Sequence, residues 1–161
     1  MLLVPLVLAL AISAAPDTED RVDRELMIHG FRSPSTGLEL RESFLGFHVG
    51  LYPTTLDENA AGESRTTWFL KFGLTAYFLG FDTGSGRESS PFVGVSLVQG
   101  LNNDWDVSES ITGGAGVMFD AGFRWAAWRG LDLRLGAMGL LGFDGRFLVR
   151  PAPGLSWSVP L

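Results

Sequence analysis

Seven polar residues in this sequence have side chains suited to acid–base chemistry or to binding a charged ligand. They are His48, Lys71, Tyr77, Asp120, Arg124, Asp132 and Arg134. Each is predicted to lie on the polar side of a strand whose other side is apolar. If the polar sides enclose a narrow interior, we expect the aspartates to pair with the lysine and arginines, because an unpaired buried charge is costly. A wider interior would make the same set a selectivity or ligand site.

Short catalytic patterns are also present, but none is specific. Asp82-Thr83-Gly84 resembles the catalytic turn of aspartic proteases, although the same triplet is common in ordinary turns. His29 and His48 are the only histidines. Ser43 or Ser96 could partner one of them in a lipid-modifying enzyme, but their spacing supports no particular triad. With no cysteine and no histidine pair at metal-ligand spacing, we expect no metal and no cofactor, and the sequence predicts no defined enzyme activity.

The length and charge of the chain narrow the class of protein. Its 161 residues predict one domain, and the net charge of −6 argues against nucleic acid as a partner. The uncharged run MLLVPLVLALAISAA, residues 1–15, is too short to span a membrane as a helix. It predicts a secretory signal peptide, leaving residues 16–161 as the folded domain.

The rest of the chain alternates between apolar segments and connectors rich in Gly, Ser, Asn, Asp and Glu. The segments lie near 25–32, 37–42, 44–53, 66–82, 90–101, 110–128, 130–143 and 147–159. The polar connectors lie near 54–65, 83–89 and 102–109, and Arg129-Gly130 and Asp144-Gly145 predict tight hairpin turns. The break at Glu42-Ser43 is weak. The pattern therefore predicts eight strands, or seven if the second and third segments are continuous.

Within these segments the alternation has a period of two, which indicates strands rather than helices. Large apolar residues share one side: Trp68, Leu70, Phe72, Leu74, Val117, Phe119, Phe123, Trp125 and Trp157. Glycines and polar residues share the other side, which could not fill an apolar core. An antiparallel barrel with the apolar side facing lipid and the polar side inside suits both. In lipid, only a closed barrel lets a sheet pair all of its backbone groups.

With this pattern, the chain resembles the small outer-membrane β-barrel proteins of Gram-negative bacteria over most of residues 16–161. Its ending, Gly154-Leu155-Ser156-Trp157-Ser158-Val159, resembles the C-terminal assembly signal of that family, although Pro160-Leu161 follow it. The resemblance implies a place in the bacterial outer membrane, contact with its lipid, and recognition by the barrel-insertion machinery. It leaves the oligomeric state open.

The sequence favours a structural or surface-interaction role for an all-β, eight-stranded transmembrane barrel with a plugged polar lumen. An eight-stranded barrel is just wide enough for its interior to be filled by side chains. The alternatives are a narrow, porin-like channel or small-ligand transporter and, third, a membrane-embedded lipid-modifying enzyme. A serine within hydrogen-bond reach of a histidine, near the lipid boundary, would favour the enzyme.

Overall fold

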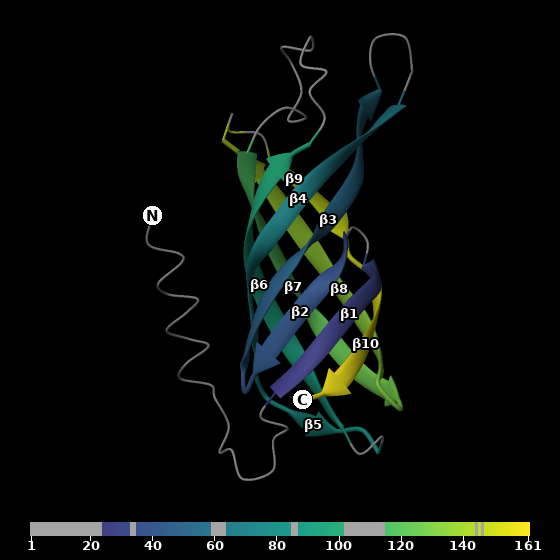
Figure 1. The fold of residues 1–161 in the computed structure, drawn as a ribbon. Coiled ribbons are helices and arrows are strands. Elements are labelled where there is room, and N and C mark those ends of the chain that lie inside the picture. Colours follow the sequence, from purple (N-terminus) through teal and green to yellow (C-terminus); the bar gives the residue numbers. More distant parts are fainter. Residues whose placement is uncertain are drawn as a thin grey trace.

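A computed structural model describes residues 24–32, 35–58, 64–84, 87–101, 115–143, 145 and 147–161. The predicted signal peptide, the predicted connector near 102–109 and Asp144 of one predicted turn lie outside these ranges. The described residues form an all-β structure (Figure 1). Within the described ranges, no helix is long and apolar enough to cross a membrane.

The strands follow one another round a closed antiparallel barrel (Figure 1). They are β1 (Arg24–Arg32), β2 (Ser35–Glu42), β3 (Leu45–Glu58), β4 (Ser64–Tyr77), β5 (Phe81–Asp82), β6 (Glu88–Gly100), β7 (Ala115–Trp128), β8 (Leu131–Gly142), β9 (Phe147–Pro151) and β10 (Gly154–Pro160). The short β5 pairs with β6 and stands apart from the barrel order. The pairing of β10 with β1 closes the wall.

Strands β9 and β10 together form the eighth strand of the barrel. Pro151 pairs with Ala137 and Gly154 pairs with Arg134, so both strands keep one register against β8. Between them, the Ala152 N–H donates to the Gly136 carbonyl at 2.8 Å. The predicted fold of eight antiparallel strands in a barrel is therefore confirmed.

The uncertain break between the second and third segments is a turn at Ser43 and Phe44, where Ser43 has φ of 54°. The predicted connector at 54–65 was too long, because β3 continues to Glu58 and β4 begins at Ser64. Its threonines favour strands although the stretch is polar. The predicted segment 66–82 was also too long. β4 ends at Tyr77, and Leu79 has φ of 51°, which a strand cannot accommodate.

The strands run obliquely around the barrel axis. Starting at Glu25 on β1 and following the paired residue on each successive strand around the barrel leads to Arg150 on β9. Across the closing pair of strands, however, Glu25 itself pairs with Pro160 on β10. The register thus advances by ten residues (160 − 150) in one circuit, which for eight strands corresponds to a tilt of about 40°. Tilt and register together give the relative height of each residue along the axis.

We call the end where β1 begins and β10 ends the lower end (Figure 1). The Leu161 N–H donates to the Arg24 carbonyl there at 3.0 Å, and the tight turns at Ser43 and at Arg129-Gly130 lie at the same end. Strands β3 and β6 end at the opposite, upper end.

Glycines occupy inward positions near mid-height on seven of the eight barrel strands: Gly37, Gly50, Gly73, Gly94, Gly122, Gly136 and Gly154. A Cβ on Gly37 would lie 2.2 Å from the Val49 carbonyl oxygen, and one on Gly122 would lie 2.3 Å from that of Leu135. At Gly37 and Gly122 the neighbouring strand approaches too closely for a side chain. The glycine-rich side of the sequence therefore forms the tightly curved waist of the barrel.

Candidate functional site

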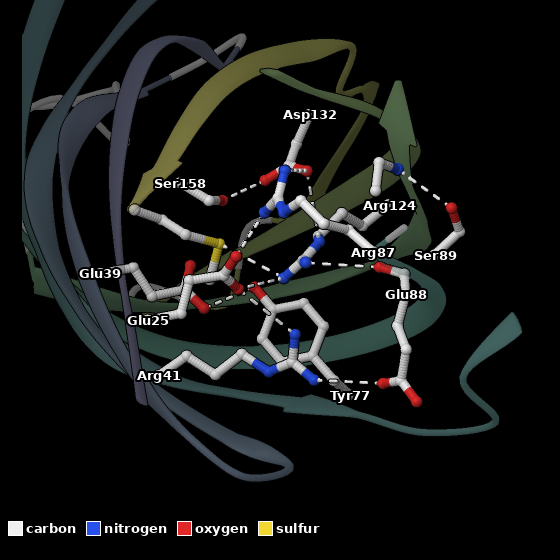
Figure 2. Close-up of polar contacts among 12 residues, drawn as sticks. Glu25, Glu39, Arg41, Tyr77, Arg87, Glu88, Ser89, Arg124, Asp132 and Ser158 are labelled. Carbon is white, nitrogen blue, oxygen red and sulfur yellow. Dashed lines mark hydrogen bonds and ion pairs between the residues drawn. The ribbon is translucent and has the colours of Figure 1, made fainter. Parts of the chain in front are cut away.

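The interior of the barrel divides by height into three zones with different chemistry. The lower zone contains eight charged residues and one tyrosine: Glu25, Glu39, Arg41, Tyr77, Arg87, Glu88, Arg124 and Asp132, which Figure 2 shows, and Arg134, which contacts Glu39 and Tyr77. The middle zone contains His48, Lys71, Thr75, Ser96 and Asp120. The upper zone is the apolar cluster of Tyr52, Phe69, Val98, Met118, Met138, Leu140 and Ala152.

In the lower zone, the Glu25 carboxylate is the meeting point of three arginines. Arg124 Nη1 lies 2.9 Å and Arg41 Nη1 lies 3.4 Å from Glu25 Oε2, and Arg87 donates to the other carboxylate oxygen. Asp132 accepts from Arg87 Nη1 at 3.1 Å and from the Ser158 hydroxyl. Each buried carboxylate thus has several donors, which compensates for its removal from water.

Tyr77 connects the second half of the lower zone. Its hydroxyl donates to Glu39 and accepts from Arg134, while Arg134 Nη2 also lies 3.3 Å from Glu39 Oε2. His29 Nε2 lies 3.0 Å from the same carboxylate oxygen. The guanidinium carbon of Arg41 stands 4.7 Å from the Tyr77 ring centroid, within cation–π range. In this zone four guanidinium groups face four carboxylates, so its charges balance.

Arg87 reaches the lower zone from the connection between β4 and β6 rather than from a barrel strand (Figure 2). Burial alone would lower the pKa of Arg87, but the carboxylates of Asp132 and Glu25 outweigh it and raise the pKa. The preceding Thr83 is held to Ser89 by a 2.8 Å hydroxyl contact. This connection therefore brings the Arg87 side chain into the lower zone, against Glu25 and Asp132.

The protease-like triplet lies in the same connection and behaves as a turn. The exposed Asp82 carboxylate accepts the Gly84 N–H at 2.7 Å, and Gly84 has φ of 82°. This is the local hydrogen bond by which aspartate stabilises turns. The arrangement does not support the protease resemblance.

The middle zone holds one ion pair and one histidine cluster. Lys71 Nζ lies 2.6 Å from Asp120 Oδ2, with both side chains 2% exposed. His48 contacts the Thr75 hydroxyl at 3.1 Å through Nδ1 and the Ser96 hydroxyl at 2.9 Å through Nε2. A serine is therefore within reach of a histidine, but both are buried inside the barrel rather than at the lipid boundary that the enzyme alternative requires.

All seven polar residues named from the sequence are buried inside the barrel. The structure gathers Tyr77, Arg124, Asp132 and Arg134 in the lower zone and the other three in the middle zone, so they form two groups rather than one.

The sequence reasoning missed Glu25, Glu39, Arg41 and Arg87, and it named His29 only as a candidate catalytic histidine. The inward positions of Glu25, His29, Glu39 and Arg41 were detectable, since these residues alternate with the exposed Ile28, Leu38 and Leu40 along β1 and β2. Arg87 carried no such signal because it lies off the barrel strands.

The outer surface is apolar. Of the nine residues predicted to face lipid, eight are exposed and Val117 is half-buried. Trp125, Trp128 and Trp157 lie near the lower end of this surface, and Trp68 lies near the upper end. Register and tilt separate Trp68 from Trp125 by roughly 25 Å along the axis.

Within the described ranges, no group of three or more His, Cys, Asp or Glu side chains is placed to hold a metal ion. Comparisons with protein-family models, with curated proteins and with solved structures found no match.

Proposed function

We propose that this protein is an outer-membrane β-barrel with a plugged lumen and a structural or surface-interaction role. The observation that carries the proposal is the reversed polarity of the barrel. Among the described residues, twenty-seven large apolar side chains are between 38% and 70% exposed, most of them on the outer wall, while the ion pairs of the lower and middle zones lie inside.

The amount of exposed apolar surface supports a lipid environment. The side chains of this outer wall expose an area on the order of 2,000 Å², whereas the largest apolar patch on a soluble monomer is roughly 300–600 Å². An apolar band about 25 Å tall, with aromatic residues at both borders, is what a bilayer requires of a barrel. The spacing of Trp68 and Trp125 agrees with that height.

The interior favours a plug over a channel. The upper zone is packed with side chains that are at most 7% exposed, and the charges of the lower zone are paired with one another. Neither zone offers ions or a polar solute a path. The surface role is supported by the longest interval between neighbouring barrel strands, residues 101–114, which begins where β6 ends at the upper end, opposite the tight turns. In outer-membrane barrels, the longer loops face the exterior.

The proposal is tested by refolding the urea-denatured chain in the presence of phospholipid vesicles. We expect a barrel that migrates differently on gels before and after boiling, resists protease, and produces no steady current in planar bilayers. A chain that stays monomeric in water without lipid or detergent would contradict the membrane assignment. A steady current from the native chain would instead favour the channel.

A further inference from the structure

The turn between β7 and β8 has an unexpected residue at its first position. Arg129 has φ of 33° and Gly130 has φ of 96°, and the flanking Trp128 and Leu131 are paired with each other. A two-residue hairpin turn with positive φ at both positions favours Asn-Gly, because asparagine and glycine tolerate that conformation. Arginine adopts it much less often. The geometry of the turn therefore does not account for Arg129.

Two exposed indoles stand beside this turn on the outer wall. Leu131 is paired with Trp128 on one side and with Trp157 on the other, so the three side chains share the outer face of the sheet. Trp128 is 60% and Trp157 is 44% exposed. A Cβ on Gly130 would lie 3.0 Å from Trp157 Cε2 and 3.1 Å from Trp157 Nε1. The N–H donor of this indole therefore lies against the turn.

Arg129 keeps its positive charge available to a ligand. Its side chain is exposed, and its guanidinium carbon stands 5.4 Å from the centroid of the Trp128 ring. This cation–π contact orients the cation, but the ring carries no net charge that would neutralise it. Within the described ranges, Arg129 forms no ion pair. Arg24, an exposed arginine at the same end of the barrel, differs because it lies 3.0 Å from Glu42.

The height of the turn indicates which ligand reaches it. Trp128 and Trp157 lie at the lower border of the apolar wall, and Arg129 follows Trp128 into the turn beyond that border. Tryptophans at such a border lie at the level of the lipid headgroups. The N–H groups of a guanidinium match the oxygens of a phosphate in this layer. A cation without a carboxylate partner favours a lipid with net negative charge over a zwitterionic one.

We propose that the β7–β8 turn binds the headgroup of an anionic phospholipid in the leaflet at the lower end. Arg129 contacts the phosphate, the Trp157 N–H is a second donor, and the first carbons of the lipid lie on Trp128 and Leu131. This inference rests on the proposed membrane function. It differs from general contact with lipid because it assigns one headgroup to one turn. It also accounts for an arginine at a position that favours asparagine.

The test compares the full native chain with Arg129→Asn, each refolded into vesicles of equal parts phosphatidylglycerol and phosphatidylcholine and then extracted in mild detergent. Native mass spectrometry counts the lipids that stay bound. We expect the native chain to retain phosphatidylglycerol in preference to phosphatidylcholine, and Arg129→Asn to retain about fivefold less of it. Glycerol phosphate, which has no acyl chains, should not stay bound in the same measurement. Its retention in place of the lipid would identify a soluble phosphate as the ligand and overturn the proposal.

Urea unfolding in pure phosphatidylcholine vesicles separates binding from a role in the fold. Because Asn-Gly suits the turn, the urea midpoint of Arg129→Asn should equal or exceed that of the native chain. A lower midpoint would assign Arg129 to the fold and overturn the site.

The matched control is Arg24→Asn, which removes an exposed arginine from the same end, but one that is already paired with Glu42. It should retain phosphatidylglycerol like the native chain. An equal loss in the two variants would assign retention to net charge, and either this result or unchanged retention in Arg129→Asn would overturn the site. Gel migration of the same samples reports insertion separately. A barrel that inserts but retains no lipid refutes only the site, whereas a chain that never inserts refutes the proposed function.

Discussion

The effect of a charged substitution on the outer wall distinguishes a membrane barrel from a soluble barrel. Phe72 lies near mid-height on β4, and its side chain is 42% exposed. Near the bilayer midplane, replacing it with arginine should lower the free energy of unfolding by about 2–4 kcal/mol. In water the same change at an exposed position should shift it by less than about 0.5 kcal/mol. Since 1.4 kcal/mol is tenfold, the membrane predicts a change of roughly 30- to 1,000-fold in the folding equilibrium.

The assay is reversible urea unfolding of the vesicle-bound barrel, followed by tryptophan fluorescence. Phe143→Arg is the control, because Phe143 is 70% exposed and follows β8 at the upper border of the apolar wall. There the cost should fall to about 0–1 kcal/mol, since arginine at the interface reaches water. A uniform cost at both heights, or no cost at Phe72, would refute the placement of the outer wall in lipid.

Three further predictions concern the interior. Lys71→Met should lower the free energy of unfolding by about 3–5 kcal/mol, because it leaves the buried Asp120 carboxylate without its 2.6 Å partner. Adding Asp120→Asn should restore part of that loss, which a double-mutant cycle of urea unfolding measures. Gly122→Ala should lower the free energy of unfolding by more than about 1 kcal/mol, because its Cβ would meet backbone atoms of β8. Gly30→Ala should change the free energy of unfolding far less, because a Cβ there would have no atom within 4 Å. Phe69→Ala removes one of the two aromatic rings of the upper zone and should lower the free energy of unfolding by about 3–5 kcal/mol. Planar-bilayer current should stay absent, because the ion pairs of the lower zone remain in place.

The two sides of the wall were predictable from the sequence because the side-chain period of a strand is two. Segments with aromatic residues opposite glycines could be assigned in this way without knowing which strands pair. Strand ends were less predictable. Thr54 and Thr55 extend β3 although their stretch is polar, and Ala152-Pro153 interrupt a strand whose register continues beyond them.

Which interior residues lie together could not be predicted, because this depends on the ten-residue advance of the register around the barrel. Glu25 and Arg124 are 99 positions apart in sequence and meet at 2.9 Å only because the oblique strands bring the start of β1 level with the end of β7. The place of Arg87 in the interior could not be predicted either, because Arg87 belongs to a connection rather than to a barrel strand. Side-chain parity decides whether a residue faces inward, whereas closure of the barrel decides which inward residues meet.

The separation of the interior into zones also bears on whether the barrel is plugged or forms a channel. A channel needs a continuous polar path, so both the apolar upper zone and the charged lower mouth would have to open. The upper zone could open through a change of packing alone. The lower mouth is different, because removing Arg87 still leaves Glu25 bound to Arg124 and Arg41, and leaves Asp132 bound to Arg124 and Ser158. Several ion pairs would have to separate together, and each would leave a buried charge uncompensated. The lower zone therefore favours the plug more strongly than the upper zone does.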